Sequence, residues 1–122
     1  MNKIMNTRVW LIIIAFMHTI LGILMPMLEY GNIDNLGIFL YFLVLSVHLF
    51  YIIIFTENQT QNKLGVILCA PMVIWFIISS IMKLEMFGFP IASMPNALIP
   101  IIFWTMPVIS GVYNWNSDQN KQ

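Results

Sequence analysis

The chain has 122 residues, of which 60% are hydrophobic and 8% are charged, and its formal net charge is zero. Soluble domains carry about a quarter charged residues, and a chain this short cannot hide so much apolar side chain in a core of its own. The composition therefore predicts a protein whose solvent is largely lipid. A neutral chain also argues against nucleic acid as a partner, and its single cysteine excludes a disulfide framework.

The first apolar segment covers residues 9–28 and follows a short basic lead that contains Lys3 and Arg8. A secretory signal peptide begins in the same way, but its apolar part is shorter and ends at a cleavage site flanked by small residues. No such site follows here, and three further apolar segments come after it. We therefore expect a retained transmembrane helix.

The next three apolar segments cover residues 36–55, 64–82 and 96–115. Each is close to 20 residues, the length that crosses the hydrocarbon core as a helix. Lipid allows no unpaired backbone, and none of the segments alternates as a barrel strand does. Because the links are short, sequence neighbours should pack antiparallel. The sequence thus predicts an all-α membrane protein, an antiparallel four-helix transmembrane bundle formed by a single domain over residues 1–122.

The basic residues predict the orientation of this bundle. Lys3, Arg8, Lys63 and Lys121 fall on one side of the expected spans, and Lys83 falls on the other. Lysine and arginine are enriched in cytoplasmic segments. We therefore expect both ends of the chain on the cytoplasmic side of the membrane.

Small and polar residues should mark the faces where helices meet in lipid, because association there depends on close packing and polar contacts. Each expected span has one such stripe at helical spacing. The four stripes are Ala15, His18, Gly22 and Glu29; Gly37, Tyr41, His48 and Phe55; Gly65, Cys69, Met72, Phe76, Ser79 and Ser80; and Asn96, Pro100, Pro107, Gly111 and Asn114.

Two histidines within the spans are the main candidates for function. His18 lies near the middle of the first span, where an ionisable side chain is costly and therefore a functional candidate. His48 in the second span differs from it in depth by about three residues, each rising about 1.5 Å. Thr105 lies at similar depth in the fourth span, and Tyr41 shares the expected inward stripe with His48. We take these four residues as candidates for binding a ligand or a proton.

The same residues are open to several interpretations. The histidines can be neutral side chains that hydrogen-bond across the interior. They can hold a b-type haem between His18 and His48, because imidazole is a natural axial ligand. A soft metal site is a further alternative, formed by His48 and Cys69 with Met17 or Met72. His18 can also couple a proton to transport.

Two short segments resemble a poorly characterised family of small bacterial membrane proteins with four spans. They are HisThrIleLeuGly at residues 18–22, a His-x-x-x-Gly pattern on the first helix, and PheProIleAlaSerMetProAsnAlaLeuIlePro at residues 89–100. The resemblance extends over nearly the whole chain. It implies a four-span topology in the bacterial inner membrane, and it implies no reaction.

No Ser/His/Asp set, HExxH motif or glycine-rich phosphate loop occurs in the sequence. We therefore expect a non-enzymatic membrane protein without a cofactor, which binds a small apolar ligand or acts as an accessory or immunity-type partner of another membrane protein. The alternative from a different class is a redox or proton-handling protein built on His18 and His48.

Overall fold

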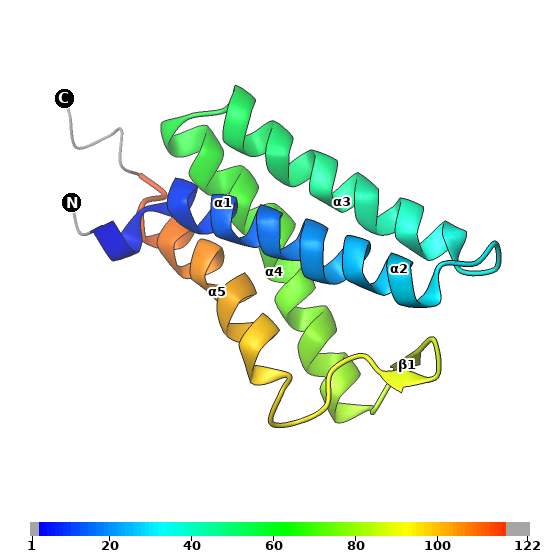
Figure 1. The fold of residues 1–122 in the computed structure, drawn as a ribbon. Helices are drawn as coiled ribbons and strands as arrows, with labels where there is room; N and C mark the ends of the chain where they lie inside the picture. Colours follow the sequence, from blue (N-terminus) through cyan, green and yellow to red (C-terminus); the bar gives the residue numbers. More distant parts are fainter. Residues whose placement is uncertain (1–2, 117–122) are drawn as a thin grey trace.

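The computed structural model describes residues 3–116, which form four helices and a small hairpin (Figure 1). A short 3-10 helix, η1 (Lys3–Met5), precedes a composite first helix with three parts: α1 (Thr7–Met17), the π-helix η2 (His18–Leu24) and α2 (Met25–Tyr30). The remaining helices are α3 (Leu36–Phe55), α4 (Asn58–Ile81) and α5 (Leu98–Tyr113). The predicted all-helical framework is therefore confirmed, with a two-stranded hairpin added to it.

Three of the helices in the described part of the chain are long and apolar enough to cross a membrane. They cover Thr7–Tyr30, Leu36–Phe55 and Asn58–Ile81. The fourth, α5, is apolar but has 16 residues, so at about 1.5 Å per residue it is roughly 24 Å long. The structure thus describes a helical membrane protein, with a last helix shorter than the predicted span of residues 96–115.

The beginning and the end of the described chain meet at one end of the bundle. The Asn114 side-chain amide donates to the carbonyls of Met5 and Ser110, and the Asn62 amide donates to the Asn114 carbonyl at 2.9 Å. Lys63 lies at the same end, with its ammonium 5.6 Å from the centre of the Trp115 ring. We call this the terminal end of the bundle.

The polar link between the second and third spans is largely helical, contrary to expectation. We predict a third helix that begins at residue 64, but α4 begins at Asn58. Gln61 explains the difference, because its side-chain amide donates to the carbonyls of Ile52 and Thr56 at 3.1 and 2.9 Å. Carbonyls in the last turn of a helix have no partner within it. Gln61 and Asn62 thus satisfy the ends of α3 and α5, and this is why two polar residues are buried here.

A hairpin lies at the opposite end of the bundle, which we call the hairpin end. Strands β1 (Glu85–Met86) and β2 (Phe89–Pro90) pair antiparallel. The two residues between them, Phe87 and Gly88, have φ of 59° and 79°, and positive φ at both positions is typical of a type I′ turn. The Phe87 ring stacks on Tyr30 at 5.7 Å and on Phe39 at 5.3 Å. The hairpin is thereby attached to α2 and α3.

The packed core lies around α1, nearer the terminal end. Its buried members come from all four helices: Leu11, Ile14, Ala15, Leu49, Ile52, Ile53, Cys69 and Trp104. From this core the helices diverge, and in Figure 1 α5 separates from α2 toward the hairpin end. The hairpin lies beside that opening.

The predicted inward faces are correct for most helices and wrong for α3. Ala15, His18, Gly65, Cys69, Ser79, Pro107, Gly111 and Asn114 are all buried. On α3, however, Gly37, Tyr41, His48 and Phe55 are exposed, and the buried residues are Phe39, Ser46, Leu49, Ile52 and Ile53. Glu29 and Asn96 are also exposed. The buried residues of α3 are mostly large and apolar, with Ser46 the one small polar residue among them, so the glycine and histidine that suggested the face lie outside the interior.

Candidate functional site: an apolar cavity around His18

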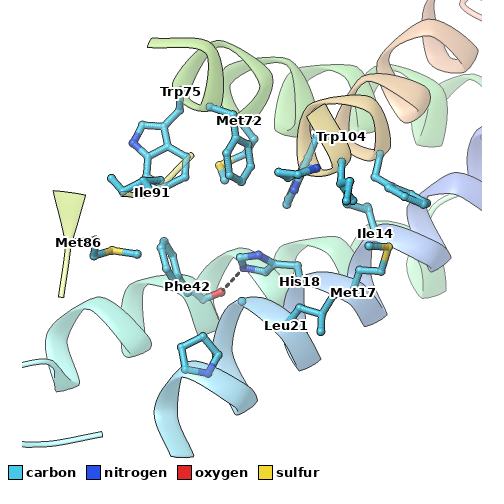
Figure 2. A pocket seen from close by; sticks show the side chains of 16 residues that line it. Ile14, Met17, His18, Leu21, Phe42, Met72, Trp75, Met86, Ile91 and Trp104 are labelled. Atoms are coloured by element: carbon cyan, nitrogen blue, oxygen red, sulfur yellow. Dashed lines mark hydrogen bonds between the residues drawn. The ribbon is translucent and has the colours of Figure 1, made fainter. Parts of the chain in front are cut away.

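A cavity of about 330 Å³ lies between the diverging helices, toward the hairpin end. It is bounded by all three parts of the first helix (α1, η2 and α2), by α3, α4 and α5, and by the hairpin segment (Figure 2). The residues that line it are Ile14, Met17, His18, Leu21, Gly22, Pro26, Phe42, Met72, Trp75, Phe76, Met86, Ile91, Ile99, Pro100, Phe103 and Trp104. Among them His18 is the one titratable side chain, and the others present apolar carbon, sulfur or indole surface. The cavity is therefore mostly apolar, and the polar groups among its lining side chains are the His18 imidazole and the indole N–H groups of Trp75 and Trp104.

His18 is buried, with 8% of its surface exposed. Its Nε2 lies 3.1 Å from the Phe42 carbonyl oxygen, and because a carbonyl only accepts, Nε2 carries the hydrogen. The Phe42 and Trp104 rings meet the imidazole edge-on at 5.6 and 5.5 Å. Figure 2 shows the ring directed from its helix toward the space beneath Met72 and Trp104. The imidazole is thus held in one orientation at the cavity wall.

Gly22 lies directly beside the imidazole. A Cβ at this position would lie 3.0 Å from His18 Nδ1, which is tighter than about nine in ten real contacts of a Cβ atom. The His-x-x-x-Gly pattern of residues 18–22 therefore has a local physical reason: the glycine leaves room for the histidine ring on the same face of the helix.

The helix widens at the cavity. From His18 to Leu24 it is a π-helix, and the Met25 N–H donates to the Ile20 carbonyl, five residues back. Pro26 follows, and a proline has no N–H to donate and crowds the carbonyl of the preceding turn. Such π segments in helices are frequently found at functional sites. Pro26 itself lines the cavity, so the irregular backbone and the cavity coincide.

Two hydrogen bonds attach the π segment to α3. One is the bond between His18 and Phe42. The other joins the hydroxyls of Thr19 and Ser46 at 3.0 Å, while Thr19 Oγ1 also lies 2.7 Å from the Ala15 carbonyl of its own helix. Adjacent polar residues thus anchor this side of the cavity to α3.

The other predicted candidates lie outside the cavity. His48 is exposed on the outer face of α3, with Nδ1 donating to the Val44 carbonyl at 2.7 Å. Tyr41 is 70% exposed on the same helix. The Thr105 hydroxyl donates to the Ile101 carbonyl of its own helix at 2.6 Å. The structure therefore does not bring His48, Tyr41 or Thr105 to His18, and the expected inward position of Tyr41 and His48 is wrong.

The predicted soft-metal ligands are also separated. Cys69 is fully buried in the core, whereas His48 is exposed. Across residues 3–116, no three His, Cys, Asp or Glu side chains come together as a metal site requires. A haem held between His18 and His48 would need both imidazoles at one cavity, and the cavity holds His18 alone of the two. His18 is thus the candidate on which the site is built.

Several lining residues have no signal in the sequence that identifies them beforehand. Phe42 contributes its backbone carbonyl, which every residue has. Met86 and Ile91 belong to the hairpin at the edge of the cavity. Gly88 is the one local indication of a turn, because glycine tolerates the positive φ that it adopts here, whereas Phe87 gives no such indication.

Comparisons of the chain with protein families, with curated proteins and with solved structures find no match.

Proposed function

We propose that this chain is a four-span inner-membrane protein that binds a small apolar ligand in the cavity around His18. The observation that carries the proposal is the cavity itself, with a volume of about 330 Å³ and a wall that is mostly apolar, with one imidazole and two indole N–H groups among its side chains. Binding sites for small molecules are concave and mostly apolar, with a few placed polar groups, and they occur between the helices of bundles. The lining has one titratable group, so it favours binding over reaction.

The course of α5 supports a fourth span. Its last turn is joined to the terminal end through Asn114, and its first turn follows the hairpin segment at the opposite end. It therefore runs between the same two ends as α4, against which it packs. A helix of roughly 24 Å is somewhat short for a core of about 30 Å, and a bilayer accommodates such a mismatch by local thinning.

The charge distribution supports the orientation. Arg8 and Lys63 lie near the terminal end, and Lys83 follows α4 at the hairpin end. Lys121 lies outside the described residues. We infer that the terminal end faces the cytoplasm. The bacterial inner membrane is the location that the resemblance at residues 18–22 and 89–100 implies.

The position of the cavity suggests how a ligand enters. Leu21 on η2 and Ile99 on α5 line the cavity, and more than half of each side chain is exposed. In a bilayer these exposed side chains contact lipid. We infer that the ligand enters sideways from the membrane, between η2 and α5, which suits a molecule that dissolves in lipid.

A matched pair of variants on α5 tests the proposal. Ile99 and Ile102 are 57% and 55% exposed, but Ile99 lines the cavity and Ile102 does not. The probe is 2-methylnaphthalene, measured by equilibrium dialysis between lipid nanodiscs with and without the protein. We expect saturable binding that Ile99→Trp weakens about tenfold or more, or about 1.4 kcal/mol, and that Ile102→Trp leaves unchanged.

Two results would contradict the proposal. Absence of saturable binding by the parent protein would show that the cavity holds no apolar ligand of this size. Equal losses in Ile99→Trp and Ile102→Trp, with both variants folded by circular dichroism, would place the binding elsewhere on the protein.

A further inference from the structure

The two nitrogens of the His18 imidazole differ, because within the described part of the chain one forms a hydrogen bond and the other does not. Nε2 donates to the Phe42 carbonyl oxygen at 3.1 Å. A charged imidazolium would be costly within an apolar membrane interior, so the ring is neutral and Nδ1 has a lone pair. Among residues 3–116, the imidazole forms one hydrogen bond, the one at Nε2. His18 is 8% exposed and Nδ1 is not fully buried, so this acceptor has little contact with water and can still be reached by a hydrogen-bond donor.

The free nitrogen is next to the cavity. Nδ1 is the ring atom nearest to Gly22, where an added Cβ would lie 3.0 Å away. His18 and Gly22 both line the cavity. The absent side chain of Gly22 therefore leaves Nδ1 open on that side, and any other residue at this position would cover it.

The rest of the lining limits what the ligand can be. No charged side chain lines the cavity, so a carboxylate or ammonium group would be buried without a partner, which is strongly unfavourable. A hydrocarbon would leave Nδ1 without a donor, and a ketone or an ether has no hydrogen to give. An O–H group on an apolar body satisfies both the nitrogen and the wall.

We propose that the cavity recognises a lipid-soluble alcohol or phenol, whose hydroxyl donates a hydrogen bond to Nδ1 of His18. This inference rests on the proposed function, because it assigns a chemical class to the ligand of that cavity. The apolar body contacts the aromatic and methionine side chains, and the hydroxyl accounts for the polar group buried among them.

Two nearly isosteric probes test the inference, 2-naphthol and 2-methylnaphthalene, which differ by a hydroxyl in place of a methyl group. We expect the parent protein in nanodiscs to prefer 2-naphthol about fivefold to tenfold relative to the partition of each probe into protein-free nanodiscs, the gain of one net hydrogen bond. In Gly22→Ala the new methyl covers Nδ1 but leaves Nε2 with Phe42. That variant should lose the preference for 2-naphthol.

Gly37→Ala is the matched control, since a Cβ at Gly37 meets no atom within 4 Å. It should retain the preference. A second measurement does not depend on any variant. The chain has two histidines, so in ¹⁵N-histidine NMR the Nδ1 resonance of His18 should shift with 2-naphthol and not with 2-methylnaphthalene, with His48 as the internal reference.

The outcomes separate the two proposals. Equal affinity for both probes in the parent protein, or a preference that persists in Gly22→Ala with no response at His18 Nδ1, overturns the hydroxyl assignment and leaves an apolar binding site. Absence of saturable binding by either probe overturns the binding function and the assignment together.

Discussion

The helices α4 and α5 approach each other closely at Gly111, and replacement of this glycine by alanine tests how the bundle is packed. A Cβ at this position would lie 2.6 Å from Val66 Cγ2 and 2.8 Å from the Asn62 carbonyl oxygen. Neither neighbour moves easily. Val66 is β-branched and stiff at χ1, and Asn62 is part of the α4 backbone, with its side chain bonded to the Asn114 carbonyl at 2.9 Å.

The cost follows from these distances. Ordinary contact begins at 3.4 Å, so α4 and α5 must move apart by about 0.8 Å (3.4 minus 2.6) at this point unless Val66 changes rotamer. Overpacking of this kind costs about 1–3 kcal/mol. Alanine is favoured over glycine within a helix by about 1 kcal/mol, which offsets part of that cost. We therefore expect Gly111→Ala to lower the free energy of unfolding by up to about 2 kcal/mol.

The assay is unfolding in mixed micelles with increasing sodium dodecyl sulfate, followed by circular dichroism and tryptophan fluorescence. Gly37→Ala makes the same chemical change at a helical position where the added methyl meets no atom within 4 Å. It should be neutral or slightly stabilising. If Gly111→Ala proves as stable as Gly37→Ala, the contact between α4 and α5 is looser than described and the reasoning fails.

Two further predictions concern topology and His48. Reporter fusions at the two ends of the chain should both report the cytoplasm, because four spans return the chain to its starting side; opposite locations would mean that α5 does not cross. The His48→Phe variant should bind 2-methylnaphthalene as the parent does and unfold within about 0.5 kcal/mol of it, because His48 is exposed and bonds only its own helix. A loss of binding in this variant, or a haem absorption band that His48→Phe abolishes, would favour the redox alternative instead.

The helices are predictable from composition because lipid leaves a backbone few choices. The predicted second span, residues 36–55, coincides with α3, Leu36–Phe55. The ends of the others are less predictable, because tertiary contacts set them. Gln61 extends α4 into a polar segment by satisfying carbonyls of α3, and no local pattern in residues 56–63 indicates that partner.

The inward face of α3 shows a second limit. In a soluble helix the apolar side faces the core. In lipid both sides of α3 are apolar, so the spacing of apolar residues does not indicate which side faces inward. Small and polar residues then become the guide. That guide is correct for Gly65 and Gly111, where backbones approach closely, and wrong for Gly37 and His48, which face outward.

His18 can be selected as a candidate from the sequence, whereas the cavity around it cannot. An ionisable side chain in mid-span is unusual enough to be found in the sequence alone. The cavity depends on the π segment before Pro26, on the Phe42 carbonyl and on the hairpin residues Met86 and Ile91. These features arise from backbone geometry and from contacts between distant segments, neither of which a pattern of residue types encodes.

The location of the cavity follows from how residue size is distributed along the bundle. At the terminal end, Gly65 lies against Leu11 at a virtual Cβ distance of 3.3 Å, and Gly111 lies closer still to α4, so the helices meet with no space between them. Toward the hairpin end the facing residues are large and rigid, including Trp75, Phe76 and Phe103. Such rings cannot interdigitate as closely as glycine faces do, and they hold the helices apart. Close packing at one end and bulky side chains at the other therefore make the helices diverge, and the opening lies beside His18.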